Sequence, residues 1–300
     1  LDASHSGCGL MLNAAAYVKQ FVSIPVGAVT YMDPAHAPDF FEKALEDGKI
    51  DFFLMNRPIA NCDPEYPNKL REGRIKEIRP CCRCLHCAMD FNNHMGTMEG
   101  CRTNACKGRA HGDEMPEGYE VPAGDGEKNV MVIGGGPAGL EAARVCAERG
   151  YAVTLYEKSR ALGGQLYHTD FASFKWPLRD YKNWLKMQLE RKGVEIRLNT
   201  EATPDGIAKE GFEAVIAATG AVPNIPRFAQ KEDGTIKDGL MTCLDVFGNE
   251  DKLGKRVIIV GGSETGVETG MHLCETGHEV TVLTRQAELA HDASKLHSIT

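Results

Sequence analysis

Residues 130–139 read VMVIGGGPAG, and this stretch decides the fold of the region around it. Four apolar residues predict a buried strand, and the glycines that follow fit the pattern G-x-G-x-x-G. Gly134 permits the tight turn, Gly136 lets a pyrophosphate approach the backbone, and Gly139 lets helix and strand pack closely. An apolar helix and a second strand then lead to Glu157, where a carboxylate can bind ribose hydroxyls. The order of these parts predicts a Rossmann-like dinucleotide site.

A second strand–glycine–helix unit follows, with Gly261 and Gly266 in place but Ser263 at the middle glycine position. After its second strand the acid is replaced by Thr284, which Arg285 follows. A missing carboxylate removes the usual partner of the NAD ribose diol, whereas an arginine can pair with the 2′-phosphate of NADP. We expect a nicotinamide nucleotide here and leave NADH and NADPH open. The alternatives are a solvated arginine and an ADP-like ligand bound without hydride chemistry.

Composition and charge favour a globular protein and argue against nucleic-acid binding and against a membrane span. Hydrophobic residues make up 42% and charged residues 25% of the 300, as in globular proteins. The net charge of −8, from 34 basic and 42 acidic residues, argues against a nucleic-acid partner. No apolar run reaches the roughly 18 residues of a membrane span. Leu1 is no initiator and no secretory signal follows it, so we expect an internal piece of a longer, cytoplasmic protein.

Six of the eleven cysteines fall within 81–106, which in a reducing compartment favours metal ligands over disulfides. The spacing C-x2-C-x2-C-x13-C suits a cubane cluster or zinc. A cluster between flavin domains can relay single electrons, which zinc cannot, so we expect [4Fe-4S]. The expected ligands are Cys81, Cys84, Cys87 and Cys101. Cys82 or Cys106 could replace one of them. The other cysteines are interpreted as small buried hydrophobic residues: Cys8, Cys62, Cys146, Cys243 and Cys274.

The first 80 residues carry two apolar runs, 24–29 and 52–55, separated by a helical pattern around 40–45. Such an alternation predicts parallel strands buried on both faces. Further along, Glu157 is followed by a Gly-Gly pair, and the run Ala-Thr-Gly ends at Gly220. Both resemble secondary signatures of two-dinucleotide-domain flavoproteins, and this resemblance makes FAD preferable to NAD at the first loop. The residues expected around FAD are Gly134, Gly136, Gly139, Glu157, Gly164, Gln165, Thr219 and Gly220.

Together these pieces resemble the iron–sulfur flavoenzymes of the old yellow enzyme superfamily, among them 2,4-dienoyl-CoA reductase, enoate reductase, trimethylamine dehydrogenase and the bile-acid-inducible NADH:flavin oxidoreductases. The resemblance covers nearly the whole chain and is densest over 24–81. It implies the last part of an FMN-binding TIM barrel that runs into the cluster loop. It also implies an FMN phosphate held at strand ends by Thr30, Asn56 and Arg57. The family more often has Gly-Arg where Thr30-Tyr31 stands, and three residues between its second and third cluster cysteines.

The expected fold is therefore α/β, with tandem Rossmann-like FAD and NAD(P) domains after the barrel and cluster segments. The expected segments are a barrel part at 1–80, the cluster at 81–109, a linker at 110–128, the FAD domain at 129–225, and an NAD(P) domain from 226 to 300 inserted in the FAD domain. The resemblance implies that electrons pass from NAD(P)H through FAD, [4Fe-4S] and FMN to an activated C=C of an enoyl-CoA, enoate or steroid-like substrate.

The alternatives to this function are an electron-input module like the small subunit of glutamate synthase, an amine dehydrogenase running the chain in reverse, and a zinc-stapled scaffold. The expected partners are a small-molecule substrate, an electron carrier in one branch, and a second copy of the chain in a homo-oligomer. The catalytic proton donor is expected upstream of Leu1.

Overall fold

The computed structural model describes residues 7–87, 100–107 and 120–291. The chain divides into two compact units. Unit 1 comprises 1–125, 148–150 and 177–192, and unit 2 comprises 126–147, 151–176 and 193–300. The five expected segments stay predictions, and their parts at 1–6, 88–99, 108–119 and 292–300 lie outside the described residues.

Unit 1 opens with a β/α arrangement. α1 (Leu12–Lys19) precedes β1 (Gly27–Ala28), and α2 (Pro38–Glu46) leads from β1 to β2 (Phe52–Phe53). The strands pair in parallel, with Gly27 opposite Phe52. Pro38 suits the first helical turn because it needs no N–H partner there. The apolar runs and the helix between them thus form as the sequence predicted, although the strands are short.

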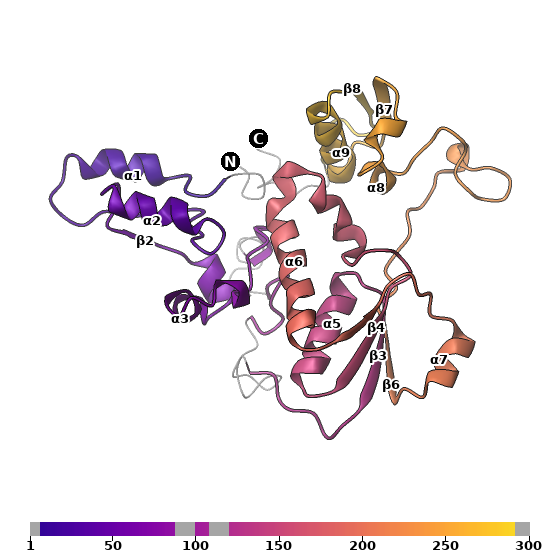
Figure 1. Ribbon diagram of the computed structural model, residues 1–300. Coiled ribbons are helices and arrows are strands. Elements are labelled where there is room, and N and C mark those ends of the chain that lie inside the picture. The colour runs from indigo at the N-terminus through magenta and orange to yellow at the C-terminus, as the bar shows by residue number, and fades with distance from the viewer. Residues whose placement is uncertain (1–6, 88–99, 108–119, 292–300) are drawn as a thin grey trace. The chain divides into compact units, whose positions relative to one another are not determined.

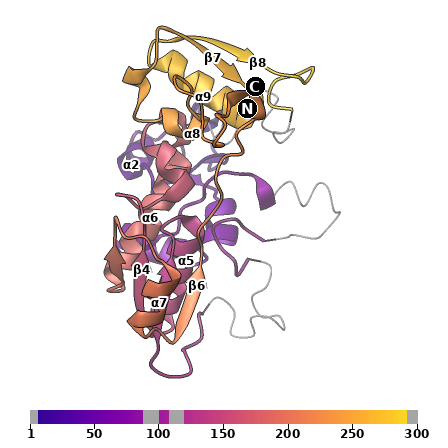
Figure 2. The ribbon, with the colours of Figure 1, turned by 90° about the vertical axis from the view of Figure 1, so that its right-hand side faces the viewer.

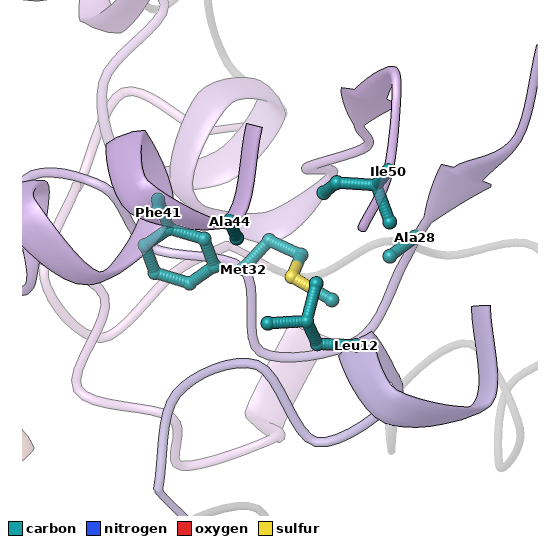
Figure 3. Packing of buried hydrophobic residues seen from close by; sticks show 6 residues of the cluster. All are labelled: Leu12, Ala28, Met32, Phe41, Ala44 and Ile50. Atoms are coloured by element: carbon teal, nitrogen blue, oxygen red, sulfur yellow. The ribbon is translucent and has the colours of Figure 1, made fainter. Parts of the chain in front are cut away.

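The core of this arrangement lies on one face of the β1–β2 pair (Figure 3). Its buried members are Leu12, Ala28, Met32, Phe41, Ala44 and Ile50. The prediction that these strands are buried on both faces stays a prediction, because their second face is not covered by the described residues of this chain. Ile24, Phe52 and Leu54 are 68%, 44% and 52% exposed. Side chains alternate across a strand, so Phe53 and Met55 pack on the core while Phe52 and Leu54 point away.

Unit 1 continues through three short helices. η1 (Arg57–Cys62) is a π-helix, α3 (Tyr66–Arg71) follows it, and η2 (Ile75–Glu77) ends just before the cysteine loop. Most of α6 (Trp176–Arg191) also belongs to this unit. The indole of Trp184 donates from Nε1 to the carbonyl of Glu77 over 3.2 Å. The guanidinium of Arg79 lies 4.9 Å from the centroid of the same ring. These contacts fix the residues that lead into the cysteine loop.

Unit 2 is built on a four-stranded parallel sheet in the order β5–β4–β3–β6 (Figure 1). The strands are β3 (Asn129–Ile133), β4 (Ala152–Tyr156), β5 (Glu195–Arg197) and β6 (Ala214–Ala217). α5 (Pro137–Glu148) connects β3 to β4, and α7 (Pro204–Glu210) connects β5 to β6. β3 and β4 are nearly continuous buried apolar runs, as a sheet covered on both faces requires. The Rossmann-like expectation for this region is confirmed.

The last part of unit 2 is a second β–α–β unit. β7 (Arg256–Val260) pairs in parallel with β8 (Glu279–Leu283), and α9 (Glu264–Glu275) packs against both strands (Figure 2). Its core contains Ile259, Leu273 and Val246, the last from α8 (Cys243–Val246). The remaining short helices are η3 (Gly164–Asp170), η4 (Ser173–Lys175), η5 (Arg227–Ala229) and η6 (Glu250–Lys252). Within the described ranges, no helix is long and apolar enough to cross a membrane.

Candidate functional site: two glycine loops and a thiol-lined cavity

The first glycine loop has the close packing that its sequence predicts. Gly134 has φ +107°, and a Cβ built on it would lie 2.3 Å from the carbonyl oxygen of Ala218. A Cβ on Gly139 would lie 1.8 Å from the carbonyl oxygen of Gly134. At Gly136, by contrast, the nearest atom would be Cα of Gly164 at 3.8 Å. A side chain at Gly134 or Gly139 would clash with the backbone of the protein. Gly136 has no such neighbour, and its lack of a side chain leaves room for a pyrophosphate to approach the backbone.

Glu157 follows β4 and is 8% exposed. Its Oε2 accepts from the backbone N–H of Gly135 over 2.6 Å, and its Oε1 accepts from that of Ser159 over 2.7 Å. Burial raises the pKa of Glu157, but the two N–H donors outweigh it and the pKa is lowered overall. The carboxylate is thus ionised and oriented at the glycine loop, and each oxygen retains a lone pair for a ribose hydroxyl.

The Gly-Gly pair after Glu157 contacts the first glycine loop, and Gln165 beside it contacts the segment that follows Gly220. The N–H of Gly163 donates to the carbonyl of Gly135 over 2.8 Å. Gly164 has φ +51°, and a Cβ there would come within 2.8 Å of Cα of Gly136. Gln165 donates from Nε2 to the carbonyl of Ala221 over 3.2 Å, which ties it to the segment that follows Thr219 and Gly220. All eight residues expected around FAD therefore belong to segments that meet at the end of β3. Their role in binding stays a prediction.

The second loop repeats this backbone geometry. Gly261 has φ +125°, and a Cβ on Gly266 would lie 2.0 Å from the carbonyl oxygen of Gly261. Ser263 is the N-cap of α9 and makes no side-chain cap hydrogen bond. Thr284 occupies the place of the acid, and its Oγ1 accepts from the N–H of Gln286 over 3.1 Å, as Glu157 accepts from Ser159. Arg285 is exposed.

The cysteine loop and neighbouring segments enclose one cavity in unit 1. All four expected ligands line it, together with two further cysteines. The lining residues are Arg57, Asn61, Cys62, Cys81, Cys82, Cys84, Leu85, Cys87, Cys101 and Arg102. Neither Cys106 nor His86 is among them. Within the described ranges, no three or more His, Cys, Asp or Glu side chains are grouped so that they could hold a metal ion.

The thiols of this cavity differ in acidity. Contact with Cys62 is the main cause that lowers the pKa of Cys101 to about 5 and also lowers that of Cys81. Contact with Cys82 lowers the pKa of Cys84 to about 6. The pKa values of Cys62 and Cys82 are raised by the same contacts, and burial raises that of Cys87. Because thiolates bind metals, a cavity lined by six cysteine side chains has the donor chemistry of a thiolate-ligated iron–sulfur centre.

Four lining residues were given no site role from the sequence: Asn61, Cys62, Leu85 and Arg102. Cys62 was interpreted as a small buried hydrophobic residue, and it is indeed buried at 3% exposure. Its Sγ nevertheless lies 3.8 Å from Sγ of Cys101. Asn61 and Cys62 come from η1, far from the cysteine loop in sequence, so no spacing rule could have included them.

The residues expected at the FMN phosphate lie at the ends of β1 and β2. Thr30 and Tyr31 both have positive φ, +77° and +55°. For a β-branched residue such as Thr30 this conformation is strained, and strain of this kind gathers at functional sites. The guanidinium of Arg57 lies 5.4 Å from the centroid of the Tyr31 ring. The side chain of Tyr31 therefore occupies space beside the cation that was expected to bind phosphate. Asn56 is the exposed N-cap of η1.

Two strand–glycine–helix loops in one chain, the first with a carboxylate oriented at it, form the fold of a dinucleotide-binding protein. Residues 128–298 match the model of the pyridine nucleotide-disulphide oxidoreductase family. The chain belongs to this family. The family and the flavoenzymes described next support FAD and a nicotinamide nucleotide as its ligands.

Known proteins resemble the whole chain. An NADH oxidase of Thermoanaerobacter brockii is 34% identical over 298 residues, which are 97% of this chain and 44% of that protein. A cinnamate reductase of Clostridium sporogenes is 33% identical over 94% of this chain and 40% of its own length. A solved structure of 2-naphthoyl-CoA reductase has a TM-score of 0.83 at 30% identity and covers 97% of this chain and 42% of that one. The chain thus spans about two fifths of the length of these relatives.

Proposed function

We propose that this chain is the electron-input part of an NAD(P)H-dependent flavin oxidoreductase that reduces an activated C=C bond of an enoate or acyl thioester. The observation that carries the proposal is the thiol-lined cavity in the same chain as two dinucleotide loops. When bound, NAD(P)H would supply a hydride to FAD, a [4Fe-4S] cluster would relay the two electrons singly, and reduced FMN would supply a hydride to one alkene carbon while a proton reaches the other. The names of two relatives, a cinnamate reductase and a 2-naphthoyl-CoA reductase, support this substrate class.

The FAD part of the proposal depends on residues of unit 2. Gly136 leaves its backbone accessible, and α5 begins directly after it, so oriented N–H groups of the first turn face a pyrophosphate. Glu157 is held by two backbone donors and presents its remaining lone pairs to a ribose. In the second loop, Arg285 is the only charged side chain among the expected nucleotide contacts, and it would pair with a 2′-phosphate.

The cluster part depends on the cavity. Cys81, Cys84, Cys87 and Cys101 would hold the irons, because they line one space and three of them carry lowered pKa values. Arg57 and Arg102 line the same cavity, and their charges offset the negative charge of four thiolates. Cys82 and Arg83, at 5% and 4% exposure, shield part of the loop from water, whereas the four expected ligands are partly exposed.

The FMN part depends on the β1–α2–β2 unit. A parallel β–α–β unit is what a β/α barrel repeats, and further strands of such a barrel would cover its second apolar face. Arg57 is the first residue of η1, which follows β2, and it also lines the cavity. This supports a flavin phosphate and a cluster as neighbours. An electron-input module without its own substrate has no need of this unit.

The full-length protein that contains this chain, purified without air, tests the proposal directly, because we expect the 300-residue piece alone to be inactive toward an alkene. We expect FAD and FMN in equal amounts, about four iron and four sulfide per chain, and NADH or NADPH consumption that depends on cinnamate or an aromatic acyl-CoA. Bound zinc without iron would favour a structural scaffold. FAD and iron without FMN or alkene reduction would favour an electron-input module. Oxidation of an amine without alkene reduction would place the protein with the amine dehydrogenases. Each of these three results would contradict the proposal.

A further inference from the structure

The π-helix η1 brings two side chains against the sulfur atoms of the proposed cluster. Asn61 and Cys62 are 7% and 3% exposed. The Asn61 amide donates from Nδ2 to Sγ of Cys87 over 3.2 Å. Sγ of Cys62 lies 3.8 Å from Sγ of Cys101, and the Cys62 thiol also faces Cys81. One turn of backbone therefore contacts three of the four expected ligands, and π-helical turns of this kind are frequent at functional sites.

The turn is held in place from the other side. Asn104 donates from Nδ2 to the carbonyl oxygens of Asn61 and Cys62, over 3.0 and 3.2 Å. Its own Oδ1 accepts from the N–H of Cys106 over 3.1 Å. Asn104 is 4% exposed, so these bonds are shielded from competing water. The positions of Asn61 and Cys62 are thus set by a residue three places after Cys101, which links η1 to the cysteine segment.

Cys62 and Cys101 cannot both be ligands of one cubane cluster in this arrangement. Each iron of a [4Fe-4S] centre takes one protein thiolate, so ligand sulfurs on different irons are separated by the cluster itself. A separation of 3.8 Å is the spacing of two sulfurs on a single metal atom, given a metal–sulfur bond of about 2.3 Å. Cys101 belongs to the loop that carries the cysteine spacing, so Cys62 is the non-ligand of the pair, and its S–H lies within reach of the Cys101 sulfur.

We propose that Asn61 and Cys62 are a pair of hydrogen-bond donors that raises the reduction potential of the cluster, with neither residue acting as a ligand. This rests on the proposed function, because it requires the cluster. Donors to the ligand sulfurs stabilise the state with the extra electron, which makes reduction easier. The amide N–H is the stronger donor and the thiol the weaker one, so Asn61 has the larger effect. Both act as positioning residues that tune the centre and do not contact substrate.

The test compares Asn61→Leu and Cys62→Ala with the parent protein, all purified without air. Iron and sulfide content are measured first, and the midpoint potential of the cluster is then determined by a redox titration followed by electron paramagnetic resonance. Both variants should retain about four irons per chain, and both midpoints should shift to more negative values, Asn61→Leu further than Cys62→Ala. Cys62→Ser, whose hydroxyl is a stronger donor of similar size, should restore the midpoint to the parent value or above.

The matched control is Cys106→Ala, since Cys106 lies in the same segment but outside the cavity lining. Its iron content and midpoint should equal those of the parent. Full iron content with unchanged midpoints in Asn61→Leu and Cys62→Ala would overturn the inference and leave the proposed function intact. Iron loss in Cys62→Ala together with iron retention in Cys101→Ala would make Cys62 the ligand and would also overturn it. A parent protein without iron would instead overturn the proposed function.

Discussion

The guanidinium of Arg83 lies 5.0 Å from the centroid of the Tyr31 ring, so the cysteine loop and the end of β1 meet through a buried cation on an aromatic ring. Arg83 is 4% exposed and also donates to Sγ of Cys8 over 3.2 Å. Both Arg83 and Tyr31 have φ +55°. A buried guanidinium costs free energy unless it has partners, and here an aromatic face supplies one.

We expect Tyr31→Leu to lower the free energy of unfolding by about 1–2 kcal/mol, because it removes a partly desolvated cation–π contact. Tyr31→Phe keeps the ring and should stay within about 0.5 kcal/mol of the parent. Both variants have an unbranched Cβ, so the strain of the positive φ is the same. Urea denaturation of the apoprotein measures the difference. An equal loss in both variants would show that the hydroxyl, and not the ring, stabilises this contact.

Alanine substitutions at two glycines of the first loop should have different effects, one on protein stability and the other on FAD binding. Gly139→Ala places a Cβ 1.8 Å from a carbonyl oxygen, so we expect a loss of at least 2 kcal/mol, roughly the cost of overpacking, and a lower Tm. Gly136→Ala meets no atom closer than 3.8 Å, so the apoprotein should keep its Tm within a few degrees while FAD content falls at least tenfold, the order expected from blocking the pyrophosphate. Thermal unfolding and flavin release check both. Normal FAD binding by Gly136→Ala would show that the backbone at this position does not contact the pyrophosphate of FAD.

The charge of Glu157 should make stability depend on pH. Its pKa is lowered from 4.5 in the folded state, so its contribution is present above about pH 4.5 and is lost as the pH falls through the lowered pKa. At pH 7, Glu157→Gln should lower the free energy of unfolding by about 1–2 kcal/mol, the worth of charge-assisted bonds to two N–H groups. The gap between parent and variant should narrow as the pH is lowered from 5 toward 3. If this difference in the free energy of unfolding widened in acid, the prediction would be wrong.

Arg285 should decide between the two nicotinamide nucleotides. If it pairs with the 2′-phosphate, Arg285→Ala should raise KM for NADPH about tenfold, equivalent to about 1.4 kcal/mol, and change KM for NADH less than twofold. Lys255→Ala is a suitable control, because it removes a cation of the same unit that lies beside Gly277 instead. Steady-state oxidation of each nucleotide is the measurement. Equal effects on both KM values would mean that Arg285 is only solvated.

Much of unit 2 could be predicted from the sequence because its signals are local. Strand, glycine loop, helix and strand follow one another within about thirty residues, and β4 ends at Tyr156, directly before Glu157, as the pattern predicted. Each glycine has a steric reason that operates over a few residues. The convergence of Gly164 and Gln165 on the loop could be predicted only through a resemblance, since they reach it by folding back across Gly136.

The sequence by itself determined the nucleotide folds and the four cysteines of the regular spacing, because backbone periodicity and ligand spacing are written in consecutive residues. Only the tertiary structure decided that Asn61 and Cys62 join those cysteines, that Cys106 does not line their cavity, and that Arg83 meets Tyr31. These relations depend on where the π-turn of η1 and the strained cysteine loop place their side chains. Such positions follow from packing between segments far apart in the chain, which no local pattern encodes.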